Sequence, residues 1–466
     1  MLPDVRQKII DGGLGVIGAA GEGTHLKIGV SSTVQNNQII VVTAQDDVVA
    51  KLGTGPLTDA VMDSIQAGSQ QIYCISTQGK AIGTKTELVK TATGTATCAL
   101  SGNPSNNFNV IFKVITGGAL NEATYVYSLN DGETFTNERT IPLNGIVNLD
   151  GTGLTLTFTS GQVPGESFKP NDMYSFKTTA PKMTNAEVLD AIDVLKKSTY
   201  IYEFIHVVGE SDETIWAAVA SEAESMFINY YIPIYFIFEA RNIKDDEELD
   251  EYVASLIAAR QKVNSYRIEV VAARALLSSI DKTIREVNAA GTVSGTFAKA
   301  KVSQSIGQVD SFSLNGILKL LPEGIESYTT VLDEAGFTTL RQYIGYEGFF
   351  VTNARMFAPS GSDYQYAEVL RTMNKACRQV RKQALRFEQG QADVEGIDNL
   401  KENLQIPLDE MSSPNVKELL QGKVIIPDGQ SVLATSKLKI KISMVPMPIM
   451  RNIDIEMGMT NPFIKS

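Results

Sequence analysis

The stretch that decides the fold is 341–387, RQYIGYEGFFVTNARMFAPSGSDYQYAEVLRTMNKACRQVRKQALRF. Aromatic and β-branched residues between glycines predict a strand over Tyr346–Thr352. A polar loop follows, and apolar residues then recur at three- and four-residue spacing, which predicts one buried face of a long helix. That face consists of Val369, Met373, Ala376, Val380 and Ala384. We therefore expect a strand, a loop and a helix that packs along this stripe.

The same helix carries a second face that is basic. Its residues are Arg371, Lys375, Arg378 and Lys382, with Glu368 as the acid near its start. The whole chain has a net charge of −12, so this basic ridge is a local exception. We expect it to meet an acidic protein surface. The alternative is a helix face balanced by acids of the same subunit.

Before this stretch, the chain begins an α/β unit and then interrupts it. Alternating strand and helix patterns occupy 38–76, with a helix expected over Leu57–Ala67. From 81 to 181 helical periodicity vanishes, and short alternating runs are separated by turn residues such as Asn130-Asp131-Gly132. This region is expected to be an inserted, all-β, sandwich-like module.

After residue 181 the α/β pattern resumes. Helices are expected at 185–197, 213–229 and 245–263, alternating with strands at 201–208, 232–238 and 267–272. The strands are nearly continuous apolar runs, which is typical of a sheet covered by helices on both faces. The small, polar residues of 289–312 predict a loop or domain boundary, and 388–414 is expected to be an exposed connection.

The end of the chain alternates apolar and polar residues. Leu438, Ile440, Ile442 and Met444 form one run and Ile453 and Ile455 belong to a second, with Pro446 and Pro448 between them. A strand with one apolar face must bury that face. We expect this arm to pair as a strand with another subunit. Completion of a sheet within its own subunit is the alternative.

The predicted fold class is therefore α/β, multidomain and mixed, with an inserted all-β sandwich-like module and extended terminal arms. The expected parts are an N-terminal arm (1–25), a discontinuous α/β core (26–80 and 182–300), the outward-facing β module (81–181), a C-terminal α/β domain (301–436) and a strand-forming arm (437–466).

Composition argues against several classes of function. A strongly acidic chain does not favour nucleic acid or an anionic membrane as a partner. Cys74, Cys98 and Cys377 lack the spacing of a zinc site and do not suggest a disulfide framework, so reduced thiols are expected. No stretch approaches the roughly 18 apolar residues of a membrane span, and no signal peptide is expected.

Catalytic motifs are weak. His25 and His206 are the only histidines, which leaves few members for a triad or a multi-histidine metal site. The pattern S-x-x-K at Ser279–Lys282 lacks its usual partner motifs, and G-x-G-x-x-G from Gly13 to Gly18 lacks the following helix and acid of a dinucleotide site. We expect no enzyme activity and no cofactor or metal.

The order of a glycine-rich turn, an apolar strand, N-A-R, a polar loop and a basic helix resembles the C-terminal region of contractile tail sheath proteins, found in phages and phage-like contractile injection systems. The matching pieces are GFFVTNARMF, SDYQYAEVLRTMNKACR and, further upstream, GPLTDAVMDSIQAGSQQIYCIS. The resemblance implies a subunit that forms stacked rings around an inner tube and contracts to drive the tube through a target envelope.

The resemblance also implies partners. They are further copies of the chain, the inner tube protein, and the baseplate and tail terminator proteins, in a virion tail or in the bacterial cytoplasm before release. In such an assembly the basic ridge would face the tube and the C-terminal arm would be an intersubunit strand. Two alternatives remain: a soluble α/β enzyme with carboxylates at its strand ends, and a tail-associated adhesion protein led by the β insert.

Overall fold

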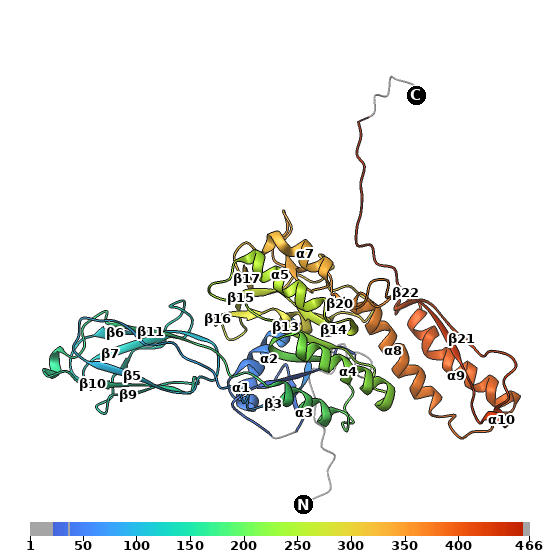
Figure 1. Ribbon diagram of the computed structural model, residues 1–466, viewed down its shortest axis with the longest axis horizontal. Helices are drawn as coiled ribbons and strands as arrows, with labels where there is room; N and C mark the ends of the chain where they lie inside the picture. Colours follow the sequence, from blue (N-terminus) through green and yellow to red (C-terminus); the bar gives the residue numbers. More distant parts are fainter. Residues whose placement is uncertain (1–21, 36–37, 460–466) are drawn as a thin grey trace, which may run out of the picture. The chain divides into compact units, whose positions relative to one another are not determined.

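The computed structural model describes residues 22–35 and 38–459 of the 466-residue chain (Figure 1). It divides into two compact units, Met1–Arg378 and Gln379–Ser466. The division lies inside one helix, α8 (Ala367–Ala384). The expected boundary between 300 and 301 is therefore wrong.

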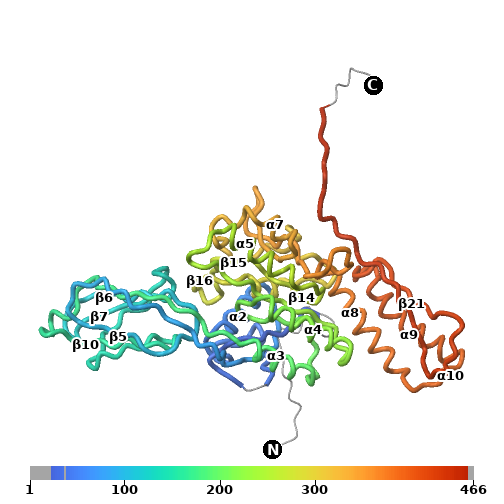
Figure 2. Tube along the Cα trace, in the orientation of Figure 1, coloured from blue at the N-terminus to red at the C-terminus, as the bar shows by residue number. Residues whose placement is uncertain are grey.

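A seven-stranded sheet forms the centre of the first unit. Its five inner strands are parallel, and an antiparallel strand closes each edge. In spatial order the strands are β2 (Ile40–Thr43), β3 (Gln71–Thr77), β1 (His25–Val30), β12 (Ile205–Ser211), β13 (Phe236–Ala240), β14 (Ser265–Val271) and β20 (Met356–Phe357). In the Cα trace of Figure 2, the blue N-terminal segments and the green segments that follow the insert come together in this core.

Helices cover both faces of the sheet. On one face, Leu26 of β1 belongs to the main apolar cluster with side chains of α3 and α4. On the other face, the position of Gly29 lies against Leu57 of α2. The helices of this unit are α1 (Val48–Leu52), α2 (Pro56–Ala67), α3 (Asn185–Leu195), α4 (Glu213–Tyr230), α5 (Leu249–Arg260), α6 (Ala290–Lys299) and α7 (Thr329–Ala335).

Helix α6 corrects the expectation of a loop over 289–312. The helix is almost entirely buried, and it contacts α2 closely. A Cβ atom at Gly295 would lie 2.3 Å from the carbonyl oxygen of Ser64, so glycine is what permits this approach. The hydroxyls of Ser294 and Thr296 donate to carbonyls one turn earlier, which satisfies them inside the core. Small residues here mark close packing rather than a loop.

Residues 301–378 also belong to the first unit. Strand β17 (Ile317–Leu321) pairs with β15 (Arg274–Ser278), which also pairs with β16 (Ile284–Asn288). The strand expected over Tyr346–Thr352 is reduced to β19 (Phe350–Val351), paired with β18 (Leu340–Arg341). Gly345 and Gly348 adopt positive φ values, so this segment turns instead of extending.

The inserted module has two antiparallel sheets and its own apolar core. The sheets are β4 (Val89–Thr91), β11 (Met173–Thr178), β6 (Phe108–Thr116), β7 (Thr124–Ser128) and β8 (Arg139–Thr140), and β5 (Thr97–Gly102), β10 (Leu154–Thr159) and β9 (Ile146–Leu149). Aromatic rings fill the core, with Phe112 and Phe158 centroids 5.0 Å apart. The predicted fold class, a mixed α/β protein with a β insert, is confirmed.

The second unit contains α9 (Val394–Ser412), β21 (Leu419–Ile425), α10 (Val432–Thr435) and β22 (Lys441–Pro446). The exposed connection expected over 388–414 is wrong, because α9 occupies most of it. Asp393 caps the helix by accepting from the amide of Gly396 at 2.8 Å. Leu404, Leu408 and Met411 are buried along one side of α9, which contacts β21.

Candidate assembly interface

The basic ridge of α8 is mostly internal. Arg371 has no exposed surface, and its guanidinium forms two hydrogen bonds with the carboxylate of Glu203, at 2.5 and 3.1 Å. Lys375 is 6 % exposed and lies 2.6 Å from Glu22. A side chain with no exposed surface cannot contact a partner, so the expected tube-facing role is wrong for Arg371, and Lys375 is directed inward as well.

The remaining two residues of the ridge, Arg378 and Lys382, are more exposed than Arg371 and Lys375. Arg378 is half-buried and donates to the carbonyl oxygen of Pro233 at 3.2 Å, and burial lowers its pKa. Lys382 is exposed on the last turn of α8, next to exposed Arg381. The ridge therefore has an inner half that fixes the helix to its own subunit and an outer half on the surface.

Glu203, the buried partner of Arg371, is the residue of this cluster that the sequence did not reveal. Burial by itself raises the pKa of a carboxyl, but the charge and hydrogen bonds of Arg371 outweigh it, and the pKa of Glu203 is below its ordinary value. Glu203 and Arg371 are 168 residues apart. Helical spacing showed that α8 carries a line of cations. Such spacing contains no information about a carboxylate that is distant in sequence from the helix.

The C-terminal alternating run completes a sheet within its own subunit. Strand β22 pairs with β21, with Ile442 opposite Val424 and Met444 opposite Gly422. Leu438 and Ile440 precede the strand and are half-buried. This is the own-subunit alternative, and the intersubunit role expected for the 438–444 run stays a prediction, because β21 occupies only one edge of β22. The two-stranded sheet leaves the outer edges of β21 and β22 without a strand partner within the described residues.

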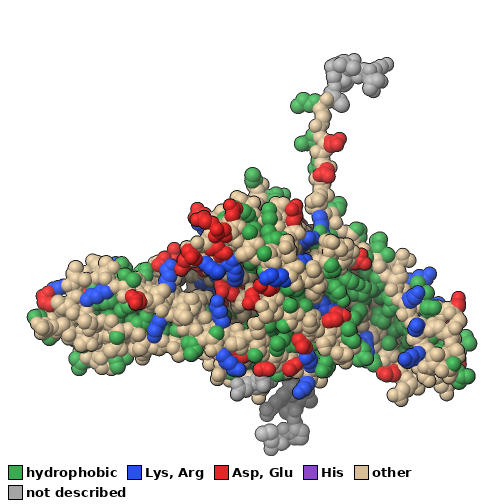
Figure 3. All heavy atoms as spheres, viewed as in Figure 1, with side chains coloured by type: hydrophobic (Ala, Val, Ile, Leu, Met, Phe, Trp, Pro, Cys, Tyr) green, Lys and Arg blue, Asp and Glu red, His purple; other side chains and the backbone are tan. Residues whose placement is uncertain are grey.

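The segment beyond β22 is different, because 447–459 forms no strand or helix. Ile453 is 70 % exposed and Ile455 is 73 % exposed. Met457 and Met459 continue the same two-residue spacing and are also exposed. Figure 3 shows hydrophobic and acidic side chains projecting in turn from this segment. Within the residues that the structure describes, this segment therefore presents an exposed apolar stripe.

A chain of buried polar groups crosses the core sheet. Nζ of Lys27 lies 2.7 Å from Nδ1 of His206, and Nε2 of His206 lies 3.1 Å from Oε1 of Glu239. Lys27 and His206 have no exposed surface. His206 is thus a hydrogen-bonded core residue, as expected. Because a substrate cannot reach these groups in the folded subunit, this cluster does not provide an open active site.

The other sequence candidates have structural roles. Ser279 and Lys282 lie in the turn between β15 and β16, closed by a hydrogen bond from the amide of Lys282 to the carbonyl of Ser279. Cys74, Cys98 and Cys377 are free thiols. The glycine motif of residues 13–18 lies outside the described residues.

Residues 22–35 and 38–459 offer neither a metal-binding cluster nor a membrane-spanning helix. Their His, Cys, Asp and Glu side chains include no group of three or more that could hold a metal ion. Among the same residues no helix is long and apolar enough to cross a bilayer.

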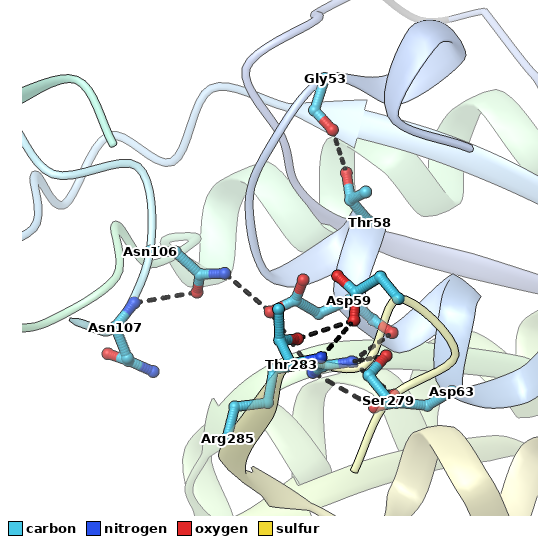
Figure 4. A network of polar contacts seen from close by, with 10 residues as sticks. Gly53, Thr58, Asp59, Asp63, Asn106, Asn107, Ser279, Thr283 and Arg285 are labelled. Carbon is cyan, nitrogen blue, oxygen red and sulfur yellow. Dashed lines mark hydrogen bonds and ion pairs between the residues drawn. The ribbon is translucent and has the colours of Figure 1, made fainter. Parts of the chain in front are cut away.

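The insert and the core are joined by polar contacts (Figure 4). Asn106 of the insert donates to the carboxylate of Asp59 on α2 at 2.7 Å. Arg285 of β16 lies 3.4 Å from that carboxylate and 2.5 Å from Asp63, one turn further along α2. Burial raises the pKa of Asp63 to about 6 in spite of the guanidinium. The two carboxylates share one arginine.

Comparison with solved structures shows the fold. The chain is similar to a protein of the anti-feeding prophage baseplate, with 11 % identity, 99 % of each chain covered and a TM-score of 0.57. It is similar to the contracted sheath complex of an extracellular contractile injection system, PVC, with 11 % identity, 98 % and 97 % covered and a TM-score of 0.54. A sheath tail protein of Desulfitobacterium hafniense gives 14 % identity, 91 % and 93 % covered and a TM-score of 0.52.

These likenesses confirm the resemblance to sheath proteins as a likeness of fold. No curated protein matches the sequence significantly. Two family models match, described as DUF2586, N-terminal domain, over residues 2–355 and DUF2586, C-terminal domain, over residues 363–464. The chain has the fold of contractile sheath proteins and belongs to the DUF2586 family.

Proposed function

We propose that the protein is a structural subunit of a contractile sheath, which polymerises as stacked rings around an inner tube and contracts to drive the tube through a target envelope. The observation that carries this proposal is the likeness to sheath structures along nearly the full length of both chains. A likeness over 98 % of this chain extends beyond the α/β core to the inserted module and the second unit.

The C-terminal segment supports polymerisation. Ile453 and Ile455 are exposed on a stretch without secondary structure, and no strand among the described residues pairs with the outer edges of the β21–β22 sheet. An exposed apolar strand and an open sheet edge complement each other, because strand addition satisfies the backbone of both. The arm of one copy adding to the sheet of another would link subunits and leave each core intact. We therefore assign the proposed intersubunit strand to the segment after Pro446 instead of residues 438–444.

The contact with the tube is proposed for the outer half of the basic ridge. Lys382 is exposed at the end of α8, and Arg381 and Arg386 lie exposed near it. The partner surface would be acidic, since opposite charge favours encounter and correct orientation. Baseplate and tail terminator proteins would bind the ends of the polymer, in a virion tail or in the bacterial cytoplasm before release. Nucleic acid and membrane lipid are not among the proposed partners.

Contraction in this proposal uses energy stored in the assembled lattice. A polymer with two stable packings can shorten by rotating rigid subunits, with no catalytic step in each subunit. Flexible arms that hold neighbouring subunits together are compatible with such rotation. The proposed role is therefore structural and not enzymatic.

Electron microscopy of the purified full-length chain, alone and with its tube protein, tests the proposal. We expect hollow tubes or stacked rings. A chain that ends after Pro446 retains β22 and is the matched control, which should remain folded and form neither. Full-length protein that stays in small, discrete oligomers in both preparations would contradict the sheath function.

A lysine reversal tests the tube contact separately. Lys382→Glu should weaken co-assembly with the tube, and the wild-type contact should weaken with added salt. Glu395→Lys, an exposed change of charge on α9, is the control. Unchanged tube binding by folded Lys382→Glu protein would exclude this contact while leaving the sheath function itself open to the first experiment.

A further inference from the structure

The place where the chain enters the core sheet is bound to the start of α8. Glu22 and Gly23 precede β1, and each contacts a charged side chain. The carboxylate of Glu22 lies 2.6 Å from Nζ of Lys375, and the amide of Gly23 donates to Oε2 of Glu203 at 3.0 Å. Glu203 and Lys375 are distant in sequence, so tertiary structure alone brings these contacts together.

The carboxylate of Glu203 binds Gly23 and Arg371 at the same time. Its Oε1 accepts from Nε of Arg371 at 2.5 Å, and its Oε2 accepts from Nη2 at 3.1 Å in addition to the Gly23 amide. The backbone amide of Glu203 also donates to the carbonyl of Thr24 at 2.8 Å. Glu203 thus joins residues 23–24 to α8, because its carboxylate binds Gly23 and Arg371 and its backbone amide binds Thr24.

Arg371 extends the network to the end of α6. Its Nη2 donates to the carbonyls of Phe297 and Ala300, at 2.9 and 3.2 Å. The carboxyl end of a helix carries partial negative charge, which favours a guanidinium there. The guanidinium carbon also lies 5.0 Å from the centre of the Phe297 ring. Arg371 is therefore held on several sides and has little freedom to move without breaking bonds.

Packing leaves residue 23 little room as well. Gly23 has a φ of +71°, and a Cβ atom there would lie 2.4 Å from the carbonyl oxygen of Ala298. The neighbouring His25 stacks on Phe204 with ring centroids 4.8 Å apart. The segment that leads into β1 is consequently clamped between α6 and the residues before β12.

We propose that Glu22, Glu203, Arg371 and Lys375 form an internal tie, which couples the entry of the chain into β1 to α8, the helix through which the chain enters its C-terminal unit. The physical reason is the burial of the central pair. If either residue of that pair loses its partner, a charge remains in a dry interior, which is strongly unfavourable. Residues 22–24 and the first half of α8 must therefore rearrange together to avoid leaving a buried charge without its partner.

This inference goes beyond the proposed function and does not rest on it, because the tie lies within one folded subunit. In an assembled polymer it would transmit a displacement of residues 22–24 to the first half of α8. In a monomer it predicts that local opening at the two places is coupled. Failure of the full-length chain to form tubes would leave the tie in place.

Amide hydrogen exchange of the full-length chain, followed by mass spectrometry, tests the tie. Glu22→Gln and Lys375→Met should each speed exchange in peptides covering residues 22–26 and in the first half of α8, by roughly tenfold, the factor that ~1.4 kcal/mol represents. The double variant should add nothing to either single change, because both break the same contact. Lys382→Met, on the exposed end of the same helix, is the matched control and should change neither region.

A further variant tests the Glu203–Arg371 pair at the centre of the tie. Arg371→Lys keeps the charge but cannot make the paired bonds to Glu203 or reach both α6 carbonyls. It should speed exchange in both regions more than Lys375→Met does. If any folded variant speeds exchange in only one of the two regions, or if the effects of Glu22→Gln and Lys375→Met add, the coupling is wrong. If Arg371→Lys does not fold, Glu22→Gln and Lys375→Met still test the coupling.

Discussion

Lys27 of β1 and His206 of β12 are direct partners in the parallel register, and their side chains form a 2.7 Å hydrogen bond with no access to solvent. The lysine donates to Nδ1, so the other ring nitrogen is free to donate to Glu239 on the next strand, β13. Three neighbouring strands thus contribute one residue each to a buried polar chain in the core sheet. This arrangement predicts how stability depends on pH.

Glu239→Gln should remove a pH dependence that the wild type shows. Burial raises the pKa of Glu239 from 4.5 to about 7, so the folded state binds the proton more tightly than the unfolded state. The resulting stabilisation is present below pH 4.5 and is lost as the pH rises to about 7. Over that window the free energy of unfolding of the wild type should fall relative to the variant by up to about 3 kcal/mol.

Chemical denaturation at a series of pH values measures this difference. Glu251→Gln, at an exposed position of α5, is the control and should keep the slope of the wild type. Lys27 should contribute in the opposite sense, because burial lowers its pKa from 10.5 to about 7, and its stabilisation is lost as the pH falls from 10.5 to 7. Parallel curves for the wild type and Glu239→Gln between pH 4.5 and 7 would show that the buried carboxyl does not titrate there.

Gly295→Ala should destabilise the first unit although alanine favours helices. The new methyl group would meet the Ser64 carbonyl at 2.3 Å and the Ala67 Cβ at 2.6 Å, so α2 and α6 would have to separate. Overpacking of this kind costs about 1–3 kcal/mol. Thermal unfolding measures the loss, and Gly165→Ala, where a Cβ atom meets nothing within 4 Å, is the control. Equal stability of the two variants would mean that the helices adjust without strain.

Deletion of residues 83–180 should leave a folded core that still polymerises. The chain enters and leaves the insert side by side, since Ala81 and Lys182 form an antiparallel bridge, and the insert has its own apolar core. A short Gly-Ser joint can therefore replace it. Circular dichroism and electron microscopy check the two parts of this prediction. A folded deletion variant that forms no tubes would place the module within the polymer contacts, and would remove the outward-facing position expected for it.

Truncations at two positions should behave differently. A chain ending after Pro446 keeps the β21–β22 pairing and should be a folded monomer that cannot polymerise. A chain ending after Gln430 loses β22, so the backbone groups of β21 that paired with it become exposed, and it should aggregate or lose structure in its second unit. Size-exclusion chromatography with light scattering compares them. Tubes formed by the Pro446 truncation would exclude the arm as the link between subunits.

Periodicity predicted the elements that bury a regular face. The helices over 185–197 and 213–229 appear as α3 and α4 with ends that differ by two residues or fewer, because capping residues such as Asp212 mark where they begin. The inserted module was visible for a similar reason, since its turn residues and two-residue alternation differ from the flanking helices. Periodicity did not reveal α6, because glycine, serine and threonine make up most of its buried residues and equally suit a loop.

The sequence by itself determined the fold class, the interruption of an α/β core by a β module and the presence of a basic helix, because these depend on local spacing along the chain. Only the tertiary structure decided which way the charges of that helix point. Arg371 is buried because Glu203, 168 residues earlier, supplies a compensating charge in the same dry interior. Likewise, the structure pairs β22 with β21 of its own subunit, across a connection that contains α10. Pairing between distant residues leaves no periodic signal, so no local pattern could have supplied it.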